Sequence, residues 1–406
     1  MSERTAVLCV LCRGAKALCG KNICPVYAFW NAVESVRAPK GVLVNGSSPP
    51  SVFVGRVGYP KVRVSPAVPP FTGDTRVYDE PEKWLGLGLN EILNMRLSLV
   101  RGVVEVNAQK SQSIEELQLL AISSRPVEVE LRFAKPPKPT VKLDIFVPPM
   151  GPSGPVEGLR LLEDPKPLHP LEKVYYDSDL KARNAIIYLY NSGVPVSTIQ
   201  KALSVGALGT GFLRKLVPTR WSITAVDDIV SKSLIDKVKG LKYLDSYLFF
   251  ERRYLDNTFV AIIAPGAWSY EWIEAWFPHT TWNPGKIVEV EEDWEGYHGR
   301  ETYALLGGCY YAARLAAAEY MLKEGIQGMV VLIREIYEGF FLPIGVWFVR
   351  ENVRALFRGV PERYDTLNEV LQRLGGSTRL PLSIWLKKSA LLKTLIRQER
   401  LESWLK

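Results

Sequence analysis

The cysteines are the side chains whose spacing points most directly to chemistry. Four of the five cysteines lie near the start of the chain, and the spacing C-x2-C-x6-C-x4-C relates Cys9, Cys12, Cys19 and Cys24. Four thiolates satisfy a tetrahedral Zn²⁺ at about 2.3 Å per bond and leave no coordination position open for catalysis. An iron–sulfur cluster takes the same ligands, and four free thiols in a loop are a third interpretation. We expect a structural zinc site.

Acidic residues are the second group that can do chemistry. Asp227 and Asp228 are adjacent, and Glu271 and Glu274 are three residues apart, which places the two glutamates on one face if their segment is helical. Clustered carboxylates can hold Mg²⁺ or Mn²⁺ and perform acid–base steps, as nucleases require, but they can equally form a helix start and a solvated surface. The candidate catalytic residues are Asp227, Asp228, Glu271 and Glu335.

A predicted apolar helix over residues 301–324 combines tyrosines with an arginine. Tyr303, Gly307, Tyr310 and Arg314 recur at helical spacing and share one face of such a helix. Tyrosines beside an arginine suit stacking on single-stranded or flipped nucleotides, although a tyrosine stripe is also typical of a buried core. Both interpretations stay open on the sequence alone.

Two Arg-Glu pairs follow predicted strands, at Arg334-Glu335 and Arg350-Glu351. Ligand crevices of α/β proteins lie just outside the carboxyl ends of strands, so these charges can face a ligand, or they can pair with each other inside the protein. The candidate nucleic-acid-binding residues are Arg220, Arg300, Tyr303, Tyr310, Tyr311, Arg314, Arg334 and Arg350.

The composition fits a basic globular protein with a polyanionic partner. The chain has 406 residues, a formal net charge of +8, 47% apolar residues and 23% charged residues. This length favours two or three domains, and the charge favours nucleic acid as the partner. No apolar stretch approaches the ~20 residues of a membrane helix, and the first residues lack the layout of a signal peptide. We expect a cytoplasmic protein that does not bind membranes.

The elements that must position these residues alternate between helical and strand patterns. The segment 178–209 is typical of two helices joined by a turn, which is the outline of a helix-turn-helix DNA reader but occurs more often as core. Further helical spacing occurs within 80–102, 113–123 and 301–324. Strands are expected at 51–64, 127–133, 140–147, 258–264, 329–333 and 340–349.

Loops rich in Gly and Pro divide the chain into four predicted parts. They are a four-cysteine zinc module over 1–40, a mixed α/β domain over 41–150, a mixed α/β main domain over 151–385, and a C-terminal helix or tail over 386–406. The expected fold class is therefore α+β (mixed α/β) and multidomain, with a small N-terminal four-cysteine zinc module.

Several longer stretches are specific enough to compare with a known family. They are the cysteine module, PPSVFVGRVGYPKV, RLSLVRG, RWSITAVDD, YYAARLAAAEY and GVWFVREN. Together, and nearly from end to end, they resemble the archaeal Nre family of DNA repair proteins, which partner the sliding clamp PCNA. The resemblance implies a zinc finger formed by the N-terminal cysteines and a role in DNA repair.

The resemblance also implies a role for the last residues, QERLESWLK at 398–406. Clamp-binding members end in Q-x-x-apolar-x-x-aromatic-aromatic, a pattern that Gln398, Leu401 and Trp404 match, while Leu405 replaces the second aromatic residue. Such a tail inserts its apolar side chains into a hydrophobic pocket of the clamp. The alternative is the last turn of an amphipathic helix.

The resulting hypothesis is a DNA repair protein that binds DNA and is recruited by PCNA. A metal-dependent nuclease or base-processing activity around the candidate carboxylates is the enzymatic form of this hypothesis. A non-enzymatic nucleic-acid-binding adaptor and an RNA-facing or ribosome-associated factor are the alternatives. The sequence leaves open whether the protein is an enzyme.

Overall fold

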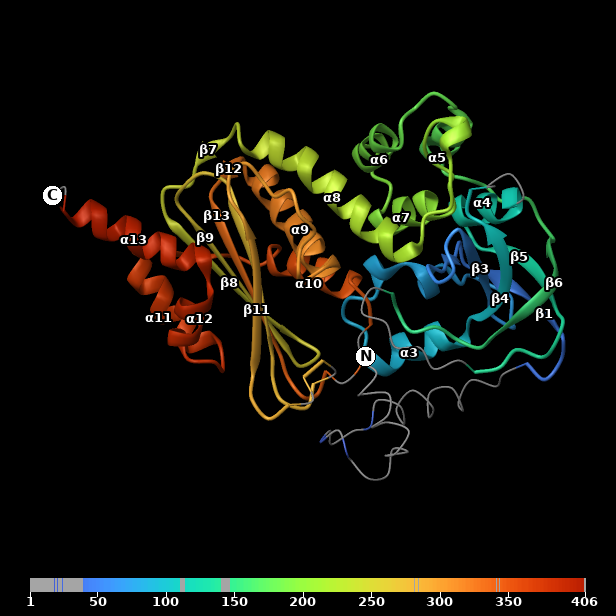
Figure 1. Cartoon of the computed structure of the whole chain (residues 1–406), viewed down its shortest axis with the longest axis horizontal. Coiled ribbons are helices and arrows are strands. Elements are labelled where there is room, and N and C mark those ends of the chain that lie inside the picture. The colour runs from blue at the N-terminus through green and yellow to red at the C-terminus, as the bar shows by residue number, and fades with distance from the viewer. Residues whose placement is uncertain are drawn as a thin grey trace. The chain divides into compact units, whose positions relative to one another are not determined.

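The computed structural model of the chain divides into two compact units (Figure 1). It describes residues 39–109, 114–139, 147–280, 282–283, 285–340, 342 and 344–404, together with Leu18, Gly20 and Cys24, and only the backbone of 399–404. The N-terminal unit holds the described residues within 39–230 and 344–347, and the C-terminal unit holds those within 231–342 and 348–404 together with Leu18, Gly20 and Cys24. Helix α8 (Thr219–Val238) begins in the first unit and ends in the second.

The N-terminal unit is built on a six-stranded sheet in the order β1-β5-β6-β4-β3-β2. Neighbouring strands are antiparallel except β4 and β6, which pair in parallel. Strand β5 alternates buried valines and leucines with exposed charged residues, so one of its faces packs on the core. The strands are β1 (Leu43–Ser48), β2 (Val52–Val54), β3 (Lys61–Val68), β4 (Val100–Asn107), β5 (Val127–Phe133) and β6 (Ser153–Leu161).

Among the described residues, helices α3 to α7 accompany this sheet. The predicted helix pair within 178–209 is confirmed, because α6 and α7 are joined by a turn in which Gly193 adopts a φ of 77°. Both helices bury an apolar stripe, which gives this pair a packing role. The helices are α3 (Leu89–Ser98), α4 (Glu115–Ile122), α5 (His169–Tyr176), α6 (Ala182–Asn191) and α7 (Val196–Ser204).

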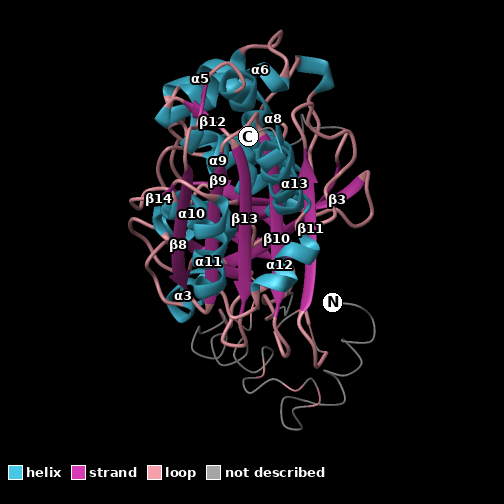
Figure 2. Cartoon of the chain, turned by 90° about the vertical axis from the view of Figure 1, so that its left-hand side faces the viewer, coloured by secondary structure: helices cyan, strands magenta, loops and turns pink. Residues whose placement is uncertain are grey.

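The C-terminal unit contains a second six-stranded sheet, in the order β11-β10-β13-β9-β8-β14. Figure 2 shows β8, β9, β13, β10 and β11 side by side. Strands β9 and β13 are buried along their whole length, as expected for central strands covered on both faces. The strands are β8 (Tyr247–Tyr254), β9 (Asn257–Ala264), β10 (Ser269–Trp276), β11 (Glu289–Glu295), β13 (Met329–Ile336) and β14 (Glu362–Tyr364), beside the short pair β7 (Lys242–Tyr243) and β12 (Ile326–Gln327).

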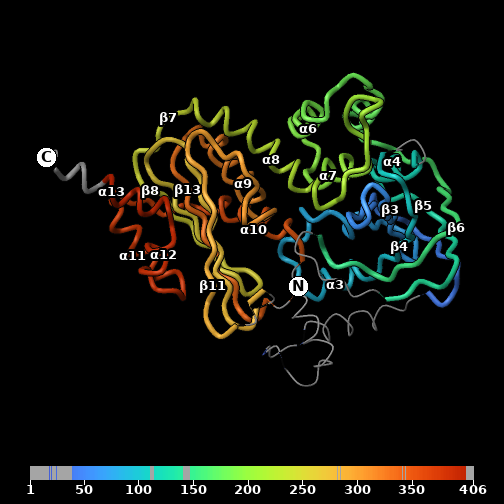
Figure 3. The backbone as a smooth tube through the Cα atoms, in the orientation of Figure 1, coloured from blue at the N-terminus to red at the C-terminus, as the bar shows by residue number. Residues whose placement is uncertain are grey.

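Helices lie on both faces of this second sheet. Figure 3 shows α11, α12 and the first part of α13 gathered on one side, with α9 and α10 on the other. The core on the first side joins apolar residues of the central strands to Leu374, Trp385 and Leu392 from the three helices. The helices are α9 (Gly308–Glu324), α10 (Trp347–Leu356), α11 (Leu367–Ser377), α12 (Leu382–Lys388) and α13 (Ala390–Trp404).

Three element predictions are corrected. The predicted strand over 340–349 is wrong, because this apolar run enters α10. The helix predicted over 301–324 begins only at Gly308, after Gly307 adopts a φ of 59°. Glu271 and Glu274 lie in strand β10, where residues three apart point to opposite faces rather than sharing one.

The structure confirms several of the remaining strand predictions and leaves part of another untested. The strands expected at 127–133 and 329–333 are confirmed by β5 and β13, and the strand expected at 258–264 by β9. Most of the strand expected at 140–147 lies outside the described residues. Among the helices that the structure describes, none combines the length and the apolar composition of a membrane span.

Candidate functional site

A pocket of about 400 Å³ opens at the β8–β9 turn of the C-terminal unit. Leu255 and Asp256 form this two-residue turn with φ values of 46° and 51°, the left-handed conformation that tight hairpins require. The pocket is lined by residues 253–258, Tyr337 and residues 376–379. Strand ends and the segment after α11 therefore supply its walls.

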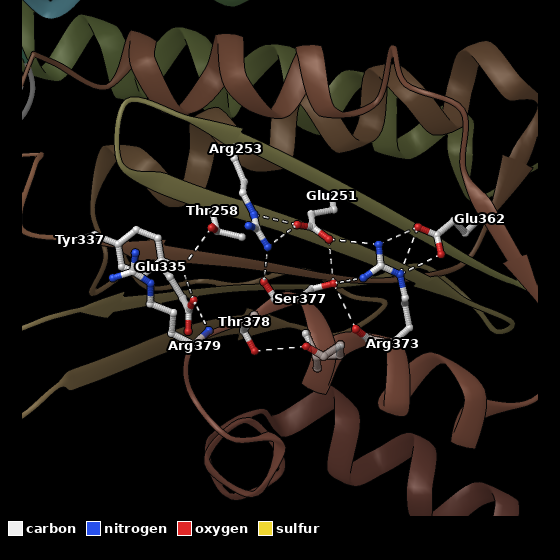
Figure 4. A network of polar contacts seen from close by, with 11 residues as sticks. Glu251, Arg253, Thr258, Glu335, Tyr337, Glu362, Arg373, Ser377, Thr378 and Arg379 are labelled. Atoms are coloured by element: carbon white, nitrogen blue, oxygen red, sulfur yellow. Dashed lines mark hydrogen bonds and ion pairs between the residues drawn. The ribbon is translucent and has the colours of Figure 1, made fainter.

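Glu335, a candidate catalytic residue, is buried beside this pocket (Figure 4). Its carboxylate accepts hydrogen bonds from the backbone N–H groups of Arg379 and Leu380, both at 2.8 Å, and from the Tyr337 hydroxyl. Burial and the neighbouring carboxylate raise the pKa of Tyr337 to about 12. Glu335 thus holds the chain after α11 against the end of β13.

Arg379 is an exposed cation of the pocket. Its guanidinium lies 3.8 Å from the centre of the Tyr337 ring, a cation–π contact that fixes its position. The side chain is exposed, and no carboxylate of the described residues forms an ion pair with it. Arg253 lies on the same pocket and donates to the Ser377 carbonyl and to Glu251.

A second hollow of about 290 Å³ adjoins the first at Arg253. Here Arg373 of α11 pairs with Glu251 at 3.1 Å and with Glu362 at 2.8 Å (Figure 4). Helix α11 starts with a capping box in which the Thr366 hydroxyl and the Glu369 side chain satisfy the first backbone N–H groups. Two carboxylates neutralise Arg373, so its contacts anchor α11 to β8 and β14.

The other candidate catalytic residues lie elsewhere. Glu271 is buried and accepts from the Ser389 hydroxyl and from the N–H groups of Ala390 and Leu391 at the start of α13. Asp227 is buried in the N-terminal unit and accepts from Gln200 at 3.0 Å. Asp228 is half-buried on the same helix. Their catalytic role stays a prediction.

Most candidate nucleic-acid-binding residues are in internal contacts. Arg314 is buried and pairs with Glu295 at 2.7 Å, and the Tyr310 hydroxyl donates to the same carboxylate. Arg334 is also buried and pairs with Glu274 at 3.0 Å. The remaining buried members of the set are Tyr311 and Arg350.

Three members of the set are more accessible. Tyr303 precedes α9 and is 58% exposed. Arg300 pairs with Asp293 at 2.5 Å and stacks over Tyr310, and Arg220 is half-buried at the start of α8. Of these three residues Tyr303 is exposed, whereas Arg220 and Arg300 are half-buried.

An exposed aromatic pair in the N-terminal unit was missed by the sequence reasoning. Tyr59 and Trp221 lie with ring centroids 5.8 Å apart, and they are 42% and 51% exposed. The Val54 N–H donates to the Thr219 hydroxyl at 2.9 Å, which ties the β2–β3 hairpin to the start of α8. Both aromatic residues lie inside quoted motifs, but their meeting in space has no local sequence signal.

The predicted metal site and tail are described only in part. Cys24 is half-buried and free, whereas Cys9, Cys12 and Cys19 lie outside the described residues. Within the described ranges, no group of three or more metal-ligating side chains is present. Gln398 is exposed on α13, whose backbone continues through Leu401 to Trp404. Leu405 lies outside the described residues.

Comparison with known proteins assigns the chain to a family of archaeal proteins. The model of the archaeal Nre N-terminal region matches residues 18–283, and that of the archaeal Nre C-terminal region matches residues 295–404. The chain therefore belongs to the archaeal Nre family. No solved structure matches it.

The relatives carry names in DNA repair. The chain is 47% identical to the DNA repair protein NreB of Archaeoglobus fulgidus, over 95% of this chain and 97% of that protein. It is 36% identical to the DNA repair protein NreA of the same organism, over 90% and 92% of the two chains. The DNA repair protein NreA of Haloferax volcanii is 33% identical over 85% of each chain.

Proposed function

We propose that the protein acts in DNA repair by binding DNA, and that Arg379 in the β8–β9 pocket contacts a DNA phosphate. The observation that carries this proposal is the exposed Arg379 guanidinium, which stacks on Tyr337. A guanidinium held in place loses little freedom on binding, and its fork of N–H groups matches a phosphate. The names of the relatives support DNA as the source of that phosphate.

The exposed pair Tyr59 and Trp221 supports a preference for single-stranded DNA. Aromatic rings stack on unpaired bases irrespective of sequence, and nearby cations bind the backbone. Arg56 and Lys61 are exposed on the hairpin that carries Tyr59, and Arg220 precedes Trp221. This surface belongs to the N-terminal unit and is a separate contact from the Arg379 pocket.

The binding form of the hypothesis is favoured over the nuclease form by the contacts of the carboxylates. Both oxygens of Glu335 and both oxygens of Glu271 accept hydrogen bonds from their own chain. Binding Mg²⁺ or Mn²⁺ would require these bonds to be exchanged for metal contacts. Cleavage of damaged, branched or single-stranded DNA by the purified protein with either ion would reverse this preference.

Two further parts of the proposal rest on the family resemblance. Residues 398–406 recruit PCNA, and the exposed Gln398 on α13 is accessible for that contact. Cys9, Cys12, Cys19 and Cys24 hold a structural zinc ion, for which four thiolates are a suitable donor set. The half-buried position of Cys24 is compatible with this role.

The test of DNA binding compares Arg379→Ala with the wild type by fluorescence anisotropy on labelled single-stranded and duplex DNA. We expect a loss of affinity of about 5- to 10-fold at low salt and a salt dependence reduced by about one phosphate contact. Arg397→Ala, at an exposed arginine of α13, is the matched control. Equal affinities for the two variants would contradict the assignment, and tighter binding of a matched RNA would favour the RNA-facing alternative.

A further inference from the structure

Arg101 of the N-terminal unit is a buried cation without an anionic partner. It lies on β4, opposite Ala67 of β3 and Ser153 of β6, and it is 7% exposed. Its Nη1 donates to the Met150 thioether sulfur at 2.9 Å, and its Nε has no hydrogen-bond partner. Within the described part of the chain no carboxylate contacts this guanidinium. A thioether is a weak acceptor and carries no charge to balance the arginine.

The carboxylate that pairs with the neighbouring Arg96 is already shared by two cations. Asp79 pairs with Arg96, and its second oxygen lies 3.4 Å from the Lys201 ammonium group. Arg96 also donates to the Pro149 carbonyl, so the two arginines hold neighbouring residues of the same segment. Burial, and then the charge of Arg96, lower the pKa of Arg101 to about 10, so it stays charged at neutral pH.

A charged group buried in this way is unfavourable unless an anion or a full set of hydrogen bonds compensates it. We propose that Arg101 anchors a binding site for a phosphate group in the N-terminal unit. The free Nε belongs to the guanidinium edge with which arginine binds phosphate through two parallel hydrogen bonds. The RLSLVRG motif thus contributes two arginines. Arg96 is paired with a carboxylate of its own chain, whereas Arg101 is the one that would bind the phosphate.

The segment that covers this site is closely fitted to the sheet. The Arg101 N–H donates to the Pro152 carbonyl at 2.8 Å. A side chain at Gly151 would place its Cβ 2.3 Å from the Leu99 carbonyl oxygen, so only glycine fits there. Residues 149–152 therefore hold Met150 over the guanidinium, and this thioether is the group that an entering phosphate displaces.

The chemistry identifies a phosphate but leaves two sources for it. One is a small molecule such as inorganic phosphate, pyrophosphate or a nucleotide, and the other is the backbone of a nucleic acid strand. The proposal is independent of DNA binding by Arg379, because Arg379→Ala should keep the response to phosphate described below.

The test follows thermal unfolding of the full-length protein in an oxyanion-free buffer. Inorganic phosphate, pyrophosphate and a short single-stranded oligonucleotide are then added in turn. We expect the wild-type midpoint to rise by roughly 3 °C or more at saturating ligand and that of Arg101→Met to stay constant. Arg132→Met, at an exposed position of β5, is the matched control and should respond like the wild type.

The midpoints without ligand provide the second readout. Because Arg101→Met removes an uncompensated charge and keeps an unbranched apolar stem, it should unfold at the same temperature as the wild type or higher. A lower midpoint would mean that an internal partner satisfies Arg101, which overturns the proposal. The Arg101→Lys variant keeps the charge but lacks the paired N–H donors of the guanidinium group. It should need at least tenfold more phosphate than the wild type for the same rise of the unfolding midpoint.

The pattern of responses identifies the source. A rise with phosphate or pyrophosphate alone indicates a small ligand, and a rise with the oligonucleotide indicates a strand. No rise with any of them, or equal rises in the wild type and Arg101→Met, overturns the site.

Discussion

Glu271 gives the sharpest test of the electrostatics in the C-terminal unit. Three hydrogen bonds from the start of α13 favour its charged form, whereas burial between the sheet and that helix favours the neutral form. Burial is the larger effect and raises the pKa of Glu271 from its usual 4.5 to about 7. The difference of 2.5 (7 − 4.5) corresponds to about 3 kcal/mol at 1.36 kcal/mol for each pH unit.

The sign of the pH dependence follows from proton binding. Between pH 4.5 and pH 7 the folded protein keeps the Glu271 proton that the unfolded chain has lost. The stabilisation is complete below about pH 4.5 and is lost as the pH rises through 7. Glu271→Gln removes this titration, so its free energy of unfolding relative to the wild type should rise by about 2 to 3 kcal/mol between pH 5 and pH 8.

The measurement is denaturant unfolding of both proteins at pH 5, 6, 7 and 8, with two spectroscopic probes to test two-state behaviour. Glu291→Gln, at an exposed glutamate of the adjoining strand β11, is the matched control. A difference between Glu271→Gln and wild type that does not change with pH would refute the dominance of burial. A difference that falls with rising pH would show that the hydrogen bonds from the start of α13 affect the pKa of Glu271 more than burial does.

Four further outcomes are expected. Glu295→Gln removes the carboxylate that pairs with the buried Arg314 at 2.7 Å and should lower the free energy of unfolding by about 3 to 5 kcal/mol, measured in urea. Deletion of residues 398–406 should abolish binding to immobilised PCNA while the melting temperature changes little; a large drop would mark these residues as core. Trp221→Ala should weaken single-stranded DNA binding by about 1 to 3 kcal/mol in a titration, with an unchanged circular dichroism spectrum. Metal analysis should find about one zinc ion per wild-type chain and much less in Cys19→Ser; iron with absorbance in the visible range would favour the cluster.

Local patterns predicted the elements that have strong periodicity. The apolar spacing within 178–209 predicted the two helices α6 and α7, and the alternation in 127–133 predicted β5. An apolar run without clear periodicity is compatible with a strand or a helix, which is why 340–349 was assigned wrongly. The start of α9 was misplaced because it depends on the left-handed conformation of Gly307.

The candidate site was less predictable because its members meet through tertiary contacts. Arg379 and Tyr337 are far apart in the sequence, and only the position of α11 brings their side chains together. Glu335 was selected for its place after an apolar run, and its actual partners are backbone N–H groups that carry no sequence signature. Arg101 likewise looks ordinary in the sequence, since burial and the lack of a partner are three-dimensional properties.

Strand β11 is an edge strand of the second sheet, which has a consequence for self-association. An edge strand offers unpaired backbone groups on which another chain can extend the sheet into aggregates. β11 exposes the carboxylates of Glu289 and Glu291, so two copies that met at this edge would repel each other through their like charges. The same negative charge would repel a polyanion, which leaves other surfaces of the unit to receive one.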